Sequence, residues 1–168
     1  ESIGAGIRVL VKGAWGFAAT SDLTATGIGN AVQQAMLIAN SNAKIQTQPV
    51  QLAKAPALGV VSWATPIKIN AMAIPVKEKA DLLLSVNAAA MNAGANFVNS
   101  QLFLVNEQKY FASTDGSYVD QDIHRIWPNF TVTATDKVTG KFRTCNRFAA
   151  PMGMGYEYLV GTTGIKFS

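Results

Sequence analysis

The sequence is short of the residues that most enzyme chemistry needs. Its 168 residues include one cysteine, Cys145, and one histidine, His124. A single cysteine excludes an internal disulfide framework and a zinc site built from several thiolates. A single histidine excludes a metal site held by a histidine pair, and any Ser/His/Asp or Cys/His nucleophilic scheme would depend on His124. These counts argue against a self-contained hydrolase.

Long apolar runs and strong charge are missing as well. No run approaches the roughly 18 apolar residues of a membrane span, and no charged leader with an apolar core opens the chain. Fourteen basic and ten acidic residues leave a net charge of +4, which is too dispersed to indicate a nucleic-acid binder. We therefore expect a soluble protein, cytoplasmic by default, with an exported parent as the alternative. Because the chain opens on Glu1 and not on methionine, we expect it to be a piece of a longer protein.

What is present is typical of a folded domain, since 49% of the residues are hydrophobic and the length suffices for a core. Alternating apolar residues on either side of Lys12-Gly13 predict a hairpin over 7–19. Apolar residues at helical spacing predict one helix over about 24–40 and a second that begins after Pro75.

The intervening segment, residues 41–75, lacks periodicity and contains four prolines. It leaves only the run 60–63 as a possible edge strand. Connections of this length wrap a surface, cover a cleft or serve in binding. We expect either an ordered strap around the core or an element that faces a cleft or a partner.

The second half of the sequence is typical of β-structure. Two short strands are expected on either side of an Asn106-Glu107 turn, and Asp115-Gly116 marks another tight turn. Further strands are predicted over 117–127, 131–137 and 141–148, the last two as a hairpin. The fold class is therefore α+β, an antiparallel sheet of hairpins packed with two main helices. Small and turn-prone residues at 149–155 place a domain edge there, which gives an α+β domain over 1–150 and a linker or the start of a further domain over 151–168.

Two groups of side chains could carry chemistry. Asp120, Asp122 and His124 project from one face of a predicted strand and are possible ligands for Zn, Mn or Fe. Neighbours on one strand face lie roughly 6.6 Å apart, however, so three of them cannot all reach one ion without a bulge. A solvated strand face is the alternative.

The second group is a basic stripe, which we define as Lys141, Arg143 and Arg147 on one face of a predicted strand. It could meet phosphates, the acidic side chains of a partner, or water. Nucleic-acid binding is disfavoured because neither a recognition helix nor an aromatic platform accompanies the stripe. Glycine-rich nucleotide-binding loops are absent from the sequence.

Several spaced segments resemble one known family. Residues 4–24, which read GAGIRVLVKGAWGFAATSDLT, are similar to the signature hairpin and helix cap of the TldD/PmbA family. The segments QLFLV at 101–105 and FASTDG at 111–116 agree, as does the small-residue linker into GYEY at 155–158. The resemblance spans nearly the whole chain in the order of the family, whose members were first named modulators of DNA gyrase and are regarded as zinc metallopeptidases.

The resemblance implies the N-terminal α+β domain of a two-domain peptidase. The parent would form a homodimer, or a heterodimer with a paralogue, around a chamber that peptide substrates enter. Members of the family carry His-Glu-x-x-x-His in a C-terminal domain, where two histidines hold zinc and the glutamate can activate its water. This sequence lacks that motif, so no catalytic and no metal-binding residue of the family can be placed on it. We expect the chain to be inactive alone, with zinc only in the parent.

The resemblance also assigns structural roles. Arg8, Gly16 and Phe17 belong to the first hairpin, and Asp115-Gly116 form the later turn. Tyr156 and Glu157 are expected near the domain junction. The alternative to a peptidase domain is a stand-alone binding module that uses the basic stripe for nucleic acid or for an acidic partner.

Overall fold

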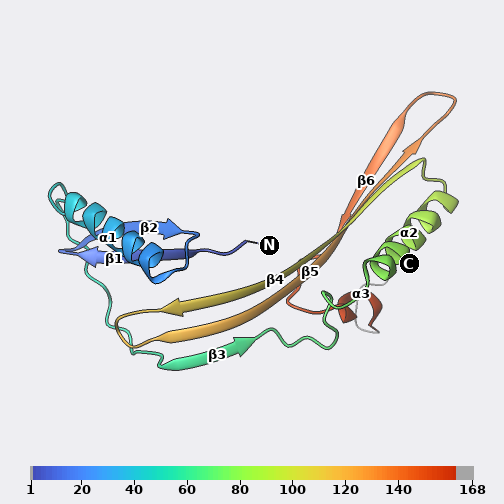
Figure 1. The fold of residues 1–168 in the computed structure, drawn as a ribbon. Coiled ribbons are helices and arrows are strands. Elements are labelled where there is room, and N and C mark those ends of the chain that lie inside the picture. The colour runs from blue at the N-terminus through green and yellow to red at the C-terminus, as the bar shows by residue number, and fades with distance from the viewer. Residues whose placement is uncertain (1, 162–168) are drawn as a thin grey trace. The chain divides into compact units, whose positions relative to one another are not determined.

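The computed structural model describes residues 2–161 (Figure 1). Two compact units meet between Ala55 and Pro56, and each is described by itself. The elements, in chain order, are β1 Ala5–Val11, β2 Ala14–Thr20, α1 Ala25–Asn42, β3 Val60–Ala64, α2 Val76–Asn92, β4 Phe97–Ala112, β5 Tyr118–Thr135, β6 Phe142–Phe148 and α3 Glu157–Val160. Because the chain contains both β-strands and α-helices, the predicted α+β class is confirmed.

The first unit is a β-hairpin with one helix on it. β1 and β2 pair antiparallel through a turn at Lys12 and Gly13, whose φ angles are 49° and 77°. Positive φ at both central residues is the geometry that two-residue hairpin turns favour, and the predicted hairpin is confirmed. α1 begins after Thr24, whose hydroxyl accepts a hydrogen bond from the Gly27 amide at 3.1 Å. This cap satisfies one of the free amides of the first turn, and the predicted helix is confirmed.

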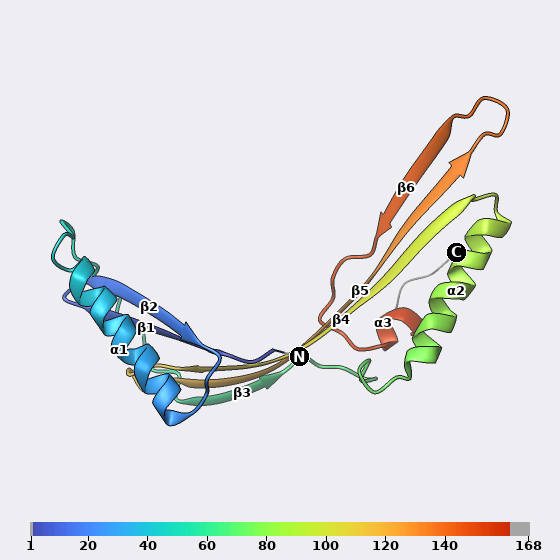
Figure 2. The same cartoon turned by 45° about the horizontal axis from the view of Figure 1, so that its top comes forward.

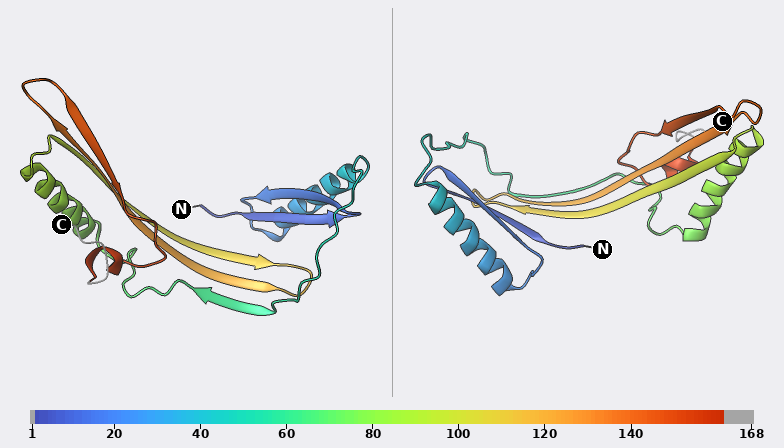
Figure 3. Two further views of the ribbon diagram at one scale, coloured as in Figure 1. Left: turned by 180° about the vertical axis from the view of Figure 1, so that it is seen from behind. Right: turned by 90° about the horizontal axis from the view of Figure 1, so that it is seen from above.

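The second unit is a sheet built around two long strands. β4 and β5 pair antiparallel over sixteen positions, from Phe97 with Thr133 to Ala112 with Tyr118. On the other edge of β5, β3 pairs in parallel with its first part and β6 pairs antiparallel with its last part. Figures 2 and 3 show β6 beside β5 and away from β4, while α2 lies along β4. The run 60–63, predicted as an edge strand, is confirmed as part of β3.

The predicted turn at Asn106-Glu107 is wrong, because β4 runs through it without interruption. A two-residue hairpin turn of the favoured kind needs positive φ at its central residues, and neither Asn106 nor Glu107 has it. Asn106 instead lies opposite His124 in the ladder with β5. Polar residues on a solvated part of a sheet gave a turn signal where the strand continues.

The sequence predicts that one strand ends at 127 and the next begins at 131. This is also wrong, because β5 continues through Pro128. Ile126 exchanges both backbone hydrogen bonds with Met152, each at 3.0 Å. Even-numbered residues of this stretch therefore direct their backbone groups away from β4. Pro128 shares that direction, so its missing N–H removes no bond from the ladder with β4.

The core of the second unit lies where the sheet, α3 and the segment before α2 meet. Ala71, Ile126, Tyr156 and Leu159 are buried together, and Leu82 of α2 packs against them. The segment 149–155 runs beside β5 through the bridge between Ile126 and Met152. That residues 151–168 begin a further domain stays a prediction, and residues 162–168 lie outside the described residues.

Candidate functional site

The single histidine lies in a polar cluster on the sheet of the second unit. His124 is buried, and its Nε2 lies 3.3 Å from Asp122 Oδ1. Asn106 Nδ2 lies 2.6 Å from Asp122 Oδ1 and 3.1 Å from His124 Nε2, so one amide group can donate to both neighbours. The His124 backbone N–H donates to Thr65 Oγ1 at 3.0 Å. These hydrogen bonds therefore link β4, β5 and the residue that follows β3.

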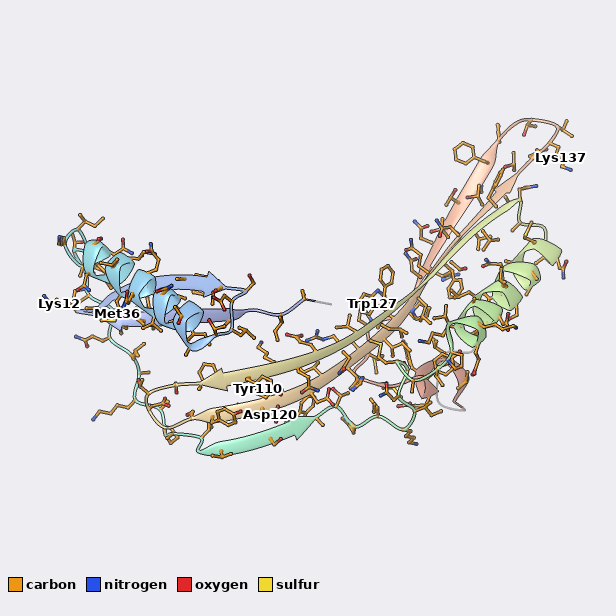
Figure 4. The ribbon with its side chains drawn as sticks, viewed as in Figure 1. Lys12, Met36, Tyr110, Asp120, Trp127 and Lys137 are labelled. Atoms are coloured by element: carbon orange, nitrogen blue, oxygen red, sulfur yellow. The ribbon has the colours of Figure 1, made fainter. Side chains whose placement is uncertain are left out.

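This cluster does not fit a zinc ion. Asp120, the third residue of the predicted metal group, lies opposite Tyr110 and Ser62, further along the sheet (Figure 4). Among residues 2–161, no group of three His, Cys, Asp or Glu side chains could hold a metal. Asn106 also occupies, with a donor group, the position that a cation would need between Asp122 and His124. The three predicted ligands thus share a strand face but do not meet at one point.

Asp115 and Gly116 form the turn between β4 and β5. The Ser113 hydroxyl and the Ser117 amide both donate to Asp115 Oδ1, and the bond from the Ser113 side chain is the main reason why the pKa of Asp115 is lowered. Gly116 has a φ of 97°, a conformation that side-chain-bearing residues rarely adopt. Ser117 Oγ accepts from the Leu58 amide at 2.9 Å, so the turn also fixes the entry to β3.

Glu157 is a buried carboxylate held by backbone amides of two segments. Lys68 N and Gly155 N donate to Oε1 at 3.1 and 2.9 Å, and Ile69 N donates to Oε2 at 2.8 Å. Burial opposes ionisation, but the hydrogen bonds from Gly155, Lys68 and Ile69 outweigh it and lower the pKa of Glu157. No cation pairs with this carboxylate among the described residues. Glu157 therefore joins the segment before α2 to the end of the described chain.

Tyr156, beside it in sequence, belongs to the core. Its side chain is 2% exposed and its amide donates to the Ile69 carbonyl at 2.8 Å. Burial, together with the negative charge of Glu78, raises the pKa of Tyr156. Gly155 allows this approach, because a Cβ there would lie 2.1 Å from Ile69 O. Tyr156 and Glu157 thus both bind the backbone of Ile69, in the segment before α2.

The predicted residues of the first hairpin lie on both of its faces. Gly16 faces α1, and a Cβ at this position would lie 1.9 Å from the Ala35 carbonyl oxygen. Arg8 and Phe17 are opposite each other on the other face. The Arg8 guanidinium lies 4.1 Å from the centre of the Trp15 ring, a cation–π contact, and Phe17 is 58% exposed. Gly16 therefore permits close packing against α1, while Arg8 and Phe17 lie on the face of the hairpin away from α1.

The basic stripe lies on β6 and in the residue before it. Lys141, Arg143 and Arg147 are exposed, and none of them forms an ion pair with a residue in the described part of the chain. Cys145 lies between the two arginines in sequence and is exposed as well. The predicted stripe is thus present as a free cationic surface.

A groove of about 440 Å³ follows the contact between α2 and β4. Its walls are mostly apolar and include Val76, Leu83 and Phe103. Phe103 stacks on Trp127 with ring centres 5.0 Å apart.

No described helix is both long enough and apolar enough to cross a membrane.

Two features of these sites were missed by the sequence interpretation. Asn106 as the partner of His124 follows only from the register of β4 and β5, which the predicted turn had broken. Two of the three amides that hold the Glu157 carboxylate, those of Lys68 and Ile69, are 89 and 88 residues away, and no side-chain pattern reports them.

Comparison with known proteins identifies the family. Residues 1–39 match the model described as PmbA/TldA metallopeptidase domain 1, and residues 71–166 match the PmbA/TldA metallopeptidase central domain. No curated protein matches the chain. The two models match in the order in which the two units occur, and the second alone covers more than half of the chain. This chain therefore belongs to the PmbA/TldD metallopeptidase family.

Proposed function

We propose that this chain is the N-terminal, non-catalytic region of a zinc metallopeptidase that degrades or processes unfolded peptides. The observation that carries the proposal is the pair of matches to the first and central domains of the family. The His-Glu-x-x-x-His motif, which supplies two zinc ligands and a general base, is not in the sequence. Zinc and hydrolysis would then belong to a C-terminal domain of the parent.

The work of the region itself would be to help form a dimer and to line the approach of the peptide. An exposed apolar row near the turn between β4 and β5 supports this role. Val61, Val119 and Phe111 lie side by side on the sheet, with Trp63 two residues further on the same face. Val61, Phe111 and Trp63 are 40%, 52% and 48% exposed. Clustered apolar surface of this kind marks interaction sites, for a second subunit, identical or paralogous, or for substrate.

The test compares this chain with the longer parent in zinc content and in hydrolysis of an unfolded peptide. We expect stoichiometric zinc and hydrolysis in the parent and neither in this chain. The reading frame of the gene gives an independent check, because it should continue into His-Glu-x-x-x-His. Hydrolysis by the purified chain alone, or a stop codon close to Ser168, would refute the proposal.

A second candidate function is a binding module that uses the basic stripe. The observation that favours it is the exposure of all three cations without an ion-pair partner in the described chain. The two candidates differ in what the parent contains, so the same reading frame separates them.

A further inference from the structure

β6 is open to solvent on both faces and along one edge. Every residue from 141 to 147 is exposed. β6 pairs with β5 alone, and no other described strand lies on its outer edge. Figure 3 shows it at the border of the sheet. A free edge presents unpaired N–H and C=O groups that another extended chain can pair with.

The hydrogen-bond pattern tells which residues offer those groups. The Lys141 carbonyl accepts from the Asp136 amide at 2.7 Å, so residue 141 directs its backbone towards β5. Because the direction alternates along a strand, residues 143, 145 and 147 also bond to β5. Phe142, Thr144 and Asn146 then direct their N–H and C=O groups outwards.

The side chains add charge to this edge. Arg143 lies opposite Ala134 and Arg147 opposite Phe130, on one face of the sheet. Four residues apart on a strand, the arginines are spaced by roughly 13 Å, with Lys141 a further two residues along. An extended peptide also places every second side chain on one face, so its side chains repeat at the same spacing as those of β6. Acidic residues at alternate positions of such a peptide would therefore fall beside the cations.

The charge also decides between possible occupants. A second copy of β6 would bring cations against cations, which is unfavourable between neighbouring strands. A nucleic acid could meet the charges, but it has no row of alternating amide donors and acceptors for the outward groups of Phe142, Thr144 and Asn146. The arginine-bearing face of β6 itself also carries no exposed aromatic ring on which a base could stack.

We propose that the outer edge of β6 binds an extended acidic segment of a peptide substrate by adding it to the sheet as a further strand. Main-chain hydrogen bonds to residues 142, 144 and 146 hold the segment, and the basic stripe selects acidic side chains. The inference rests on the proposed function, because it names the class of peptide that the region receives.

The test measures binding of fluorescent eight-residue peptides to this chain. The probe alternates glutamate and threonine, and its comparators replace glutamate with glutamine or with lysine. We expect the acidic peptide to bind roughly tenfold more tightly than the glutamine peptide, as for a few exposed ion pairs. The preference should shrink at about 1 M salt, where the screening length is roughly 3 Å.

Two changes separate strand addition from simple charge attraction. N-methylation of alternate amides in the acidic peptide blocks the main-chain bonds and leaves the protein untouched. Thr144→Pro removes one outward N–H and leaves the ladder with β5 intact. Its matched control is Thr144→Val, which also loses the hydroxyl that lies 2.9 Å from Thr133 Oγ1 but keeps the N–H. We expect the methylated peptide and the proline variant to bind several-fold more weakly, and the valine variant to bind like the original chain.

The charge arm uses Arg143→Gln with Arg147→Gln. Its control is Lys44→Gln with Lys54→Gln, which removes the same charge from exposed lysines in the first unit. We expect roughly tenfold weaker binding of the acidic peptide in the first pair only.

Equal binding of all three peptides, insensitivity to N-methylation, or equal loss in both charge variants would overturn the inference. Tighter binding of a single-stranded oligothymidylate, lost with the arginines and unchanged by Thr144→Pro, would overturn it in favour of nucleic acid. Each of these results leaves the proposed function standing as long as the parent holds zinc and hydrolyses peptides. A parent without zinc and hydrolysis defeats the proposed function, and the peptide measurements on this chain report on β6 separately.

Discussion

Glu157 and Ile69 lie 88 residues apart in the chain and are joined by a 2.8 Å hydrogen bond from the Ile69 amide to Glu157 Oε2. With the bonds from Lys68 and Gly155 to the other oxygen, this bond surrounds a buried negative charge with peptide dipoles instead of a cation. Hydrogen bonds to a charged acceptor are stronger than those between neutral groups. The contact therefore closes the second unit between the segment before α2 and the last described helix.

Replacing Glu157 with glutamine should destabilise the second unit. The new amide group can accept through one atom only and brings a donor against backbone donors, so the free energy of unfolding should fall by about 1–3 kcal/mol. Denaturant unfolding together with amide exchange at Lys68 and Ile69 measures the effect. Glu107→Gln is the control, because the Glu107 side chain is 42% exposed and its ion-pair partner among the described residues is Arg125, and it should change stability by less than about 1 kcal/mol. Unchanged exchange at Ile69 in Glu157→Gln would contradict the prediction.

The same carboxylate should make stability depend on pH in acid. Because the pKa of Glu157 is lower in the folded chain than its usual 4.5, the unfolded state binds a proton first as the pH falls. The stabilisation is therefore fully present above about pH 4.5 and is lost as the pH falls through the lower, folded value. We expect the stability difference between the original chain and Glu157→Gln to be largest near neutral pH and to shrink below 4.5. A difference that stays constant down to pH 3 would be inconsistent with this origin.

In the first unit, Gly16→Ala should separate α1 from the hairpin. The added Cβ would lie 1.9 Å from Ala35 O and 2.7 Å from Ala39 N, so the helix must move, at a cost of about 1–3 kcal/mol. Faster amide exchange in α1 and a lower melting temperature report it. Gly29→Ala in the same helix is the matched control, since its Cβ meets nothing within 4 Å. The control should gain about 0.5–1 kcal/mol from helix propensity, and equal effects of the two changes would count against close packing at Gly16.

Thr65→Val should loosen the end of β3. Thr65 is 5% exposed, and its hydroxyl accepts from the buried His124 amide. Valine keeps the branched shape and leaves that amide unsatisfied, which costs about 1–3 kcal/mol. Exchange of the His124 amide, followed by NMR, should accelerate, whereas Thr47→Val at an exposed position should leave it unchanged.

The sequence interpretation succeeded where one local cause determines the structure. Lys12-Gly13 needs only positive φ at its two residues to form the predicted turn. It failed where a distant partner decides. Asn106 has the composition of a turn residue, and only its position opposite His124 keeps it in a strand. A proline interrupts most strands, but Pro128 is tolerated within β5 because its nitrogen faces away from β4.

β5 serves three neighbours along one edge with one unbroken alternation: β3 near its start, Met152 at its middle and β6 near its end. A single extra residue between Asp122 and Pro128 would turn every later side chain to the opposite face, exchanging the buried Phe130 with its half-buried neighbours Asn129 and Thr131 and pointing the Pro128 nitrogen at β4. The length of this stretch is thus quantised in steps of two, and point substitutions are far easier for the strand to absorb than single insertions or deletions.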